Sequence, residues 1–76
     1  MAINFDLNDL QAFRAVVEQG SFRKAADTVR ISQPALSRRI EKLEDALGVR
    51  LFERTTRKVS LTQAGRGFMP SVERLL

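Results

Sequence analysis

The segment from Ser32 to Gly48 constrains the fold of this chain more than any other part of the sequence. Ser32 is a favourable helix cap, and Pro34 follows in the first turn, where its missing N–H costs nothing. Apolar residues then recur at helical spacing, and Gly48 is typical of a helix C-terminus. The pattern predicts an amphipathic helix that must bury a narrow stripe against other helices. The stripe consists of Leu36, Ile40, Leu43 and Leu47.

Two more helices are predicted before this one. Asp6 can cap a helix over about residues 7–19, and Gly20 fits its C-terminal end. Ser21 can cap a shorter helix that ends near Val29. The first helix has an apolar stripe, and the second carries two small residues that let another helix approach closely. These residues are Leu7, Leu10, Phe13 and Val17 on the first helix, and Ala25 and Ala26 on the second.

After Gly48 the pattern changes to an alternation of apolar and polar residues. This alternation predicts two short strands, over residues 49–52 and 58–61, that form a β-hairpin with a basic, hydroxyl-rich tip. Thr62 can cap a fourth helix. Gly65, Gly67 and Pro70 all disfavour a helix interior, so we expect a kink or a break near residues 68–70.

The composition narrows the classes of function. With 76 residues the chain has room for one small domain, and it contains neither histidine nor cysteine. The usual general base and the thiolate metal ligands are therefore absent, and we do not expect an enzyme, a cofactor or a metal site. No segment has the length of a membrane span. A small basic binding module is the leading class.

The positive charge lies in two blocks. Residues 21–42 hold six cations against two acids, and residues 50–58 hold four cations against one acid. An acidic stretch, residues 43–49, separates them. Either block alone would be ordinary solvated charge, but two basic elements on one face form the footprint expected for a polyanion.

A short helix, a tight turn at residues 30–31 and a helix that begins with polar residues form a helix-turn-helix pattern over about residues 22–41. The major groove of B-DNA admits one α-helix, and Gln33 and Arg38 can address adenine and guanine there. We expect base contacts from Gln33, Pro34, Ala35, Ser37 and Arg38, backbone contacts from Ser21, Arg23, Lys24, Ser32, Arg39 and Lys42, and wing contacts from Arg54, Thr55, Thr56, Arg57 and Lys58.

Each of these residues also has a simpler interpretation. Ser21 and Ser32 are helix caps first, and Gln33 and Ser37 are ordinary polar surface residues in most helices. Arg38 and Arg39 can pair with neighbouring acids such as Glu41 or Glu44. The phenylalanines are expected in the core rather than in a base-stacking platform.

The chain resembles the DNA-binding domain of LysR-type bacterial transcriptional regulators. The resemblance covers about residues 7–65 without a gap. It is carried by Gly20–Ala26 (GSFRKAA), Ile31–Arg38 (ISQPALSR), Ile40–Gly48 (IEKLEDALG), Leu51–Thr55 (LFERT) and Leu61–Gly65 (LTQAG).

The resemblance implies a mainly α fold: a winged helix-turn-helix with a three-helix core and a two-stranded β wing over residues 5–62. Residues 63–76 would begin a linker helix, through which the family forms homodimers, with tetramers expected in the full-length proteins. Pro70 departs from the family, whose linker helix is usually continuous.

The resemblance also implies that the chain is part of a longer protein. Family members carry a C-terminal effector domain that binds a small-molecule inducer, and this chain lacks it. The expected partner is a double-stranded DNA operator, and the expected location is the bacterial cytoplasm, in association with the nucleoid. A winged-helix protein–protein interaction module is the alternative function. Acidic or apolar residues at the start of the third helix would favour that alternative, and Gln33, Ser37 and Arg38 do not.

Overall fold

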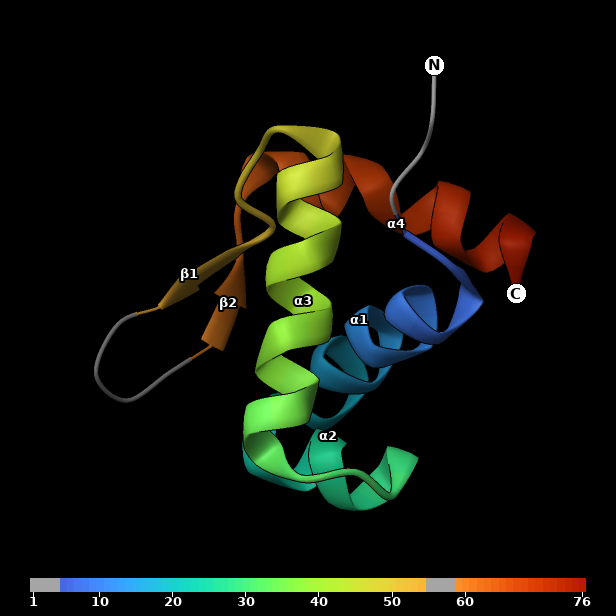
Figure 1. Cartoon of the computed structure of the whole chain (residues 1–76). Coiled ribbons are helices and arrows are strands. Elements are labelled where there is room, and N and C mark those ends of the chain that lie inside the picture. Colours follow the sequence, from blue (N-terminus) through green and yellow to red (C-terminus); the bar gives the residue numbers. More distant parts are fainter. Residues whose placement is uncertain (1–4, 55–58) are drawn as a thin grey trace.

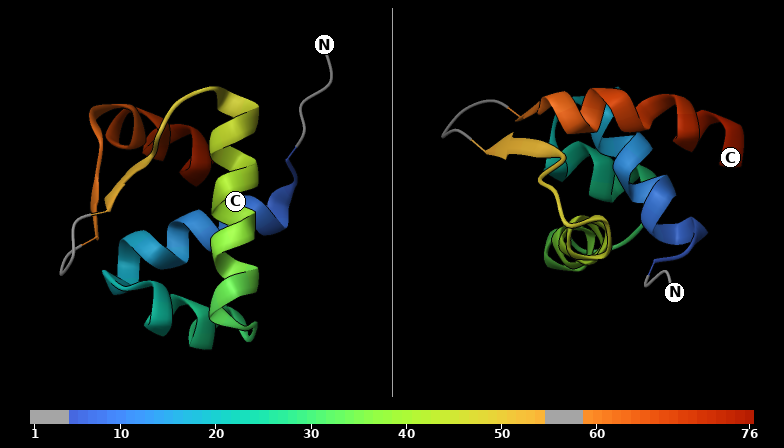
Figure 2. Two further views of the ribbon diagram at one scale, coloured as in Figure 1. Left: turned by 60° about the vertical axis from the view of Figure 1, so that its left-hand side comes forward. Right: turned by 90° about the horizontal axis from the view of Figure 1, so that it is seen from above.

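Over residues 5–54 and 59–76, four helices and a two-stranded antiparallel hairpin make up the fold (Figure 1). The computed structural model describes residues 5–54 and 59–76. Helix α3 stands in front of α1, with α2 at its N-terminal end, the hairpin projecting to one side and α4 near its C-terminal end (Figures 1 and 2). None of the helices in the described ranges is long and apolar enough to span a bilayer. The elements are α1 (Leu7–Gln19), α2 (Phe22–Val29), α3 (Gln33–Leu47), β1 (Phe52–Arg54), β2 (Val59–Leu61) and α4 (Gln63–Leu75).

The helices begin where the sequence predicts them to begin, because each has a capping side chain. Asp6 accepts the backbone N–H of Asp9 at 3.2 Å, and Asp9 accepts that of Asp6 at 3.1 Å, which forms a reciprocal capping box. The Thr62 hydroxyl likewise accepts the Gly65 N–H at 3.0 Å. Gly48 closes α3 at φ 71°, in the left-handed region that glycine enters most readily.

Phenylalanine rings join four elements at the centre of the molecule. The ring of Phe13 on α1 lies 5.2 Å from that of Phe52 on β1 and 5.6 Å from that of Phe68 on α4. Phe22 of α2 meets Phe52 at 5.8 Å. Tilted and edge-on pairs at these separations are favourable beyond the area they bury. The prediction that the phenylalanines serve the core is confirmed for these four rings.

The predicted first strand, residues 49–52, is wrong in its bounds. β1 covers Phe52–Arg54 and pairs with β2 so that Phe52 faces Leu61. Gly48 and Val49 instead close the C-terminal end of α3, because their N–H groups both donate to the Glu44 carbonyl, at 2.8 and 3.2 Å. The second strand, β2, falls inside the predicted range.

Of the kink or break predicted near residues 68–70, the break is wrong, because α4 runs as one helix with Pro70 inside it. Tertiary packing outweighs the low local propensity here. Val72 is fully buried, and Phe68 packs against the core. Gly65 is buried where α4 passes Leu51 so closely that no side chain fits.

Candidate nucleic-acid interface

The turn between α2 and α3 is tight, as predicted. Arg30 ends α2 in the left-handed conformation, at φ 61° and ψ 44°. Its N–H donates to the carbonyls of Ala26 and Asp27, and the Ile31 N–H donates to Ala26 at 3.0 Å. Only three residues therefore separate α2 from α3, in a helix-turn-helix arrangement.

Helix α3 is divided lengthwise into a core face and an outer face. Leu36, Ile40 and Leu43 are fully buried on the core face. The predicted base-contacting residues lie in the first two turns, where Gln33, Pro34 and Arg38 are exposed and Ala35 and Ser37 are half-buried. The structure thus brings these five residues together at one end of the helix.

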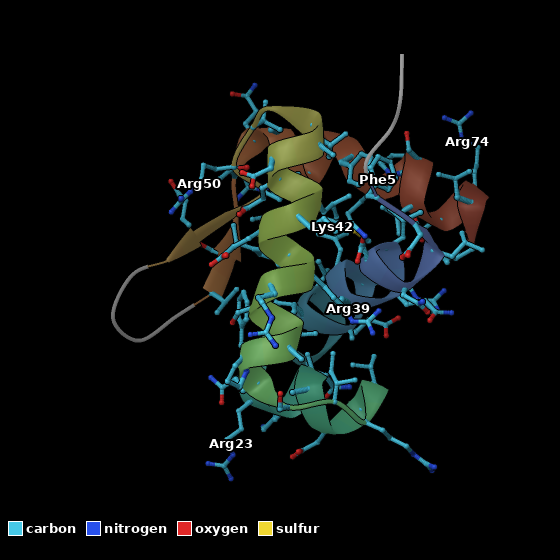
Figure 3. All side chains as sticks on the ribbon, in the orientation of Figure 1. Phe5, Arg23, Arg39, Lys42, Arg50 and Arg74 are labelled. Carbon is cyan, nitrogen blue, oxygen red and sulfur yellow. The ribbon has the colours of Figure 1, made fainter. Side chains whose placement is uncertain are left out.

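Two of the predicted backbone-contacting residues cap helices. The Ser21 hydroxyl accepts the Lys24 N–H and the Ser32 hydroxyl accepts the Ala35 N–H, each at 3.2 Å. A hydroxyl that accepts in this way still has its own hydrogen to donate. Arg23 and Lys24 are exposed, and Arg23 points away from the body of the molecule beside the start of α3 (Figure 3).

Lys42 lies on α3 but forms ion pairs within the domain. Its Nζ atom is 3.2 Å from a carboxylate oxygen of Asp9, whose side chain is 3% exposed, and 3.9 Å from that of Asp6. Arg39 is half-buried on the side of α3 that faces α1, where a hollow of about 370 Å³ lies between the two helices (Figure 3). The positive charge of Lys42 is therefore partly neutralised by α1.

The β1–β2 hairpin corresponds to the wing and projects to one side of α3 (Figure 1). Of the predicted wing contacts, Thr55, Thr56, Arg57, Lys58 and the Arg54 side chain lie outside the described part of the chain.

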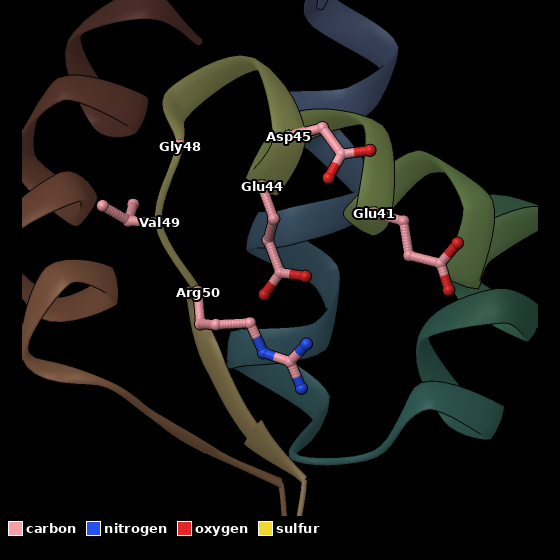
Figure 4. Close-up of a pocket in the computed structure, with 6 residues that line it drawn as sticks. All are labelled: Glu41, Glu44, Asp45, Gly48, Val49 and Arg50. Carbon is pink, nitrogen blue, oxygen red and sulfur yellow. The ribbon is translucent and has the colours of Figure 1, made fainter.

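The opposite end of α3 is acidic. A hollow of about 490 Å³ is lined there by Glu41, Glu44 and Asp45, with Arg50 on the facing segment (Figure 4). Carboxylates near the negative end of a helix repel a polyanion. The charge along α3 thus favours DNA at the N-terminal end.

Sequence reasoning missed the role of Glu44. This residue is only 6% exposed, and one carboxylate oxygen accepts the backbone N–H groups of Leu51 at 2.8 Å and Phe52 at 3.3 Å. From the sequence, Glu44 is expected only as part of the acidic stretch and as a partner for Arg38 or Arg39. The signal for its burial is its spacing, four residues after Ile40 and three before Leu47, which puts it beside the apolar stripe.

Comparison with known proteins decides the family. The family model described as bacterial regulatory helix-turn-helix protein, lysR family, matches residues 7–66. The chain belongs to the lysR family. As a lysR-family domain, it is 49% identical over 71 residues to the uncharacterized HTH-type transcriptional regulator YbhD of Escherichia coli K12. That match covers 93% of this chain and 22% of the relative, so the chain spans about a fifth of that protein's length.

Solved lysR-family structures share the fold. The crystal structure of VV2_1132, a LysR family transcriptional regulator, matches with a TM-score of 0.91 and 39% identity, covering 99% of this chain and 26% of that one. The crystal structure of a BenM_DBD/catB site 1 DNA complex matches with a TM-score of 0.88 and 46% identity over 93% of this chain and 80% of that one. The resemblance and the winged helix-turn-helix fold are therefore confirmed, and the chain is a lysR-type DNA-binding domain.

Proposed function

We propose that this domain binds double-stranded DNA sequence-specifically, with the N-terminal half of α3 in the major groove. An α-helix with its side chains is ~10–12 Å across and the groove is ~12 Å wide, so one helix fills it. The observation that carries the proposal is the exposure of Gln33, Pro34 and Arg38 in the first two turns of α3, where Pro34 and Arg38 face away from the buried Leu36 and Ile40. The match to a BenM_DBD DNA complex supports it.

Two side chains have the chemistry to identify bases. Gln33 can form two hydrogen bonds to adenine, and Arg38 can form two to guanine. Pro34 and Ala35 supply apolar contact for a thymine methyl group, and Ser37 supplies a hydroxyl. The backbone contacts that we propose are Ser21, Arg23, Lys24, Ser32, Arg39 and Lys42, and the wing contacts are Arg54, Thr55, Thr56, Arg57 and Lys58.

Residues 5–62 form the DNA-binding unit in this proposal, and residues 63–76 begin a helix through which two copies pair. Leu75 and Leu76 near the end of α4 support a pairing role, because these apolar residues are 56% and 38% exposed and pairing would bury them. The longer protein would be a bacterial cytoplasmic regulator that binds the nucleoid as a dimer or tetramer. Its effector domain would bind a small-molecule inducer.

The experiment selects bound duplexes from a random pool and then measures affinity by fluorescence anisotropy. We expect log K to fall linearly with log salt, as phosphate contacts require. Lys58→Ala should weaken binding to all duplexes alike. Arg74→Ala removes the same charge near the C-terminal end of α4 (Figure 3). It should leave the affinity within about twofold, because α4 is not among the elements that we propose to contact DNA. Failure to enrich any duplex, together with capture of a protein partner by the same end of α3, would favour the interaction-module alternative.

A further inference from the structure

A buried carboxylate joins the helix that we propose as the DNA reader to the base of the wing. Glu44 begins the last turn of α3, and its carboxylate accepts the N–H groups of Leu51 and Phe52 at 2.8 and 3.3 Å. Figure 4 shows its side chain extending from α3 toward the segment that leads into β1. Phe52 is the first residue of β1. Hydrogen bonds to an ionised acceptor are about twice as strong as neutral ones.

The same segment is fastened on its other side to the start of α4. The Leu51 carbonyl accepts the Thr62 N–H at 3.0 Å, and the Thr62 hydroxyl donates to the Arg50 carbonyl at 2.5 Å. Gly65 lies against Leu51 because it lacks a side chain. One peptide segment, residues 50–52, therefore connects α3, the hairpin and α4.

Helix–helix packing contributes little to holding α4 and the hairpin against α3, so the connection through residues 50–52 is important. The helices that pack most on α3 are α1 and α2, whereas α4 packs on α1 and β2. The described hydrogen bonds between the α3 side chains and the hairpin are those of Glu44. The orientation of the wing relative to α3 therefore depends on one side chain in addition to the core contacts of Leu51 and Phe52.

We propose that Glu44 is a positioning residue that fixes the wing relative to α3, so that both contact one DNA site at once. The inference rests on the proposed DNA binding. Glu44 itself does not contact DNA, because it is buried and lies at the end of α3 away from Gln33 and Arg38.

A double-mutant cycle of DNA affinity, measured on the duplex selected above, tests the proposal. In the wild-type chain we expect Lys58→Ala to weaken binding about threefold, and in the Glu44→Ala background by less than about 1.5-fold, because a misplaced wing has no contact left to lose. Arg38→Ala should cost the same in both backgrounds. Glu44→Gln keeps an acceptor oxygen at the same reach and should preserve the Lys58 effect. An undiminished Lys58 effect in Glu44→Ala would overturn the proposal.

A second variant and a measurement made without DNA allow the proposal to be refuted even if Glu44→Ala does not fold or the chain binds no duplex. Glu44→Asp retains the charge but is one methylene shorter, so it should behave as Glu44→Ala and carries the cycle if the alanine variant does not fold. Residual dipolar couplings of the amides of Phe52–Arg54 and Val59–Leu61 should fit the alignment tensor of α3 in the wild type and depart from it in the variant. An unchanged fit would overturn the positioning role whether or not the chain binds DNA. A wild-type chain that binds no duplex would instead refute the proposed function.

Discussion

Gly65 and Gly67 lie two residues apart in α4, and replacing each with alanine should have opposite effects on stability. A Cβ on Gly65 would collide with the Leu51 carbonyl oxygen and come within 2.8 Å of the Leu61 Cδ2 atom. A Cβ on Gly67 would meet nothing within 4 Å. The two positions share a helix and a change of residue, so the steric collision is the main difference between them.

The magnitudes follow from two terms. Glycine to alanine gains ~1 kcal/mol of helix propensity at either position. Overpacking costs ~1–3 kcal/mol, and the upper part of that range applies to Gly65 because the blocking atom is backbone, which cannot rotate away. We therefore expect Gly65→Ala to lose ~1–2 kcal/mol and Gly67→Ala to gain ~0.5–1 kcal/mol.

Thermal and urea unfolding followed by circular dichroism measure both changes. A difference of ~1 kcal/mol corresponds to a shift in Tm of ~4–8 °C for a domain of this size. The two variants should therefore melt on opposite sides of the wild type. If Gly65→Ala were as stable as Gly67→Ala, the close approach of α4 to Leu51, and with it the geometry that connects α3 to the hairpin, would be wrong.

Substitutions at three other places test separate parts of the structure. Arg30→Gly should raise the free energy of unfolding in urea by ~0.5–1 kcal/mol, because Arg30 occupies a left-handed conformation that disfavours a side chain; an unchanged midpoint would contradict that conformation. Ser32→Asp should keep the helix cap and the melting temperature but weaken DNA binding. Ser32→Ala removes the cap and should lose ~1 kcal/mol of stability. If Ser32→Asp bound DNA as tightly as the wild type, Ser32 would lie away from phosphate. Lys42→Met and Asp9→Asn should show a coupling energy of ~1 kcal/mol in a double-mutant cycle of urea unfolding; the value is kept this low because the Lys42 side chain is half-exposed and water screens the ion pair. If the two effects on the free energy of unfolding were strictly additive, the ion pair would not contribute to stability.

The sequence predicted the bounds of the first three helices because their signals are local. Ser21, Ser32 and Gly48 act on backbone groups a few residues away, so capping residues and glycines suffice to place helix ends. The exposed N-terminal end of α3 followed in the same way, because the buried stripe fixes which side chains point outward.

The errors have nonlocal causes. The start of β1 depends on Glu44, whose carboxylate holds the N–H groups of Leu51 and Phe52 from another element. The continuity of α4 across Pro70 depends on Phe68 and Val72 packing into a core formed by the rest of the chain. The family was recognisable only from the specific residues of its motifs, because periodicity and charge indicate a basic helix-turn-helix domain and no more.

The affinity of the chain for its selected duplex and for single-base variants of that duplex tests the central claim most directly. If α3 reads bases, the wild type should discriminate at the position of Arg38 by ~1–3 kcal/mol, and Arg38→Ala should lose discrimination there while keeping it elsewhere. If Arg38→Ala weakened binding equally for every duplex, or if the wild type discriminated against no base variant, the N-terminal turns of α3 would not lie in the major groove.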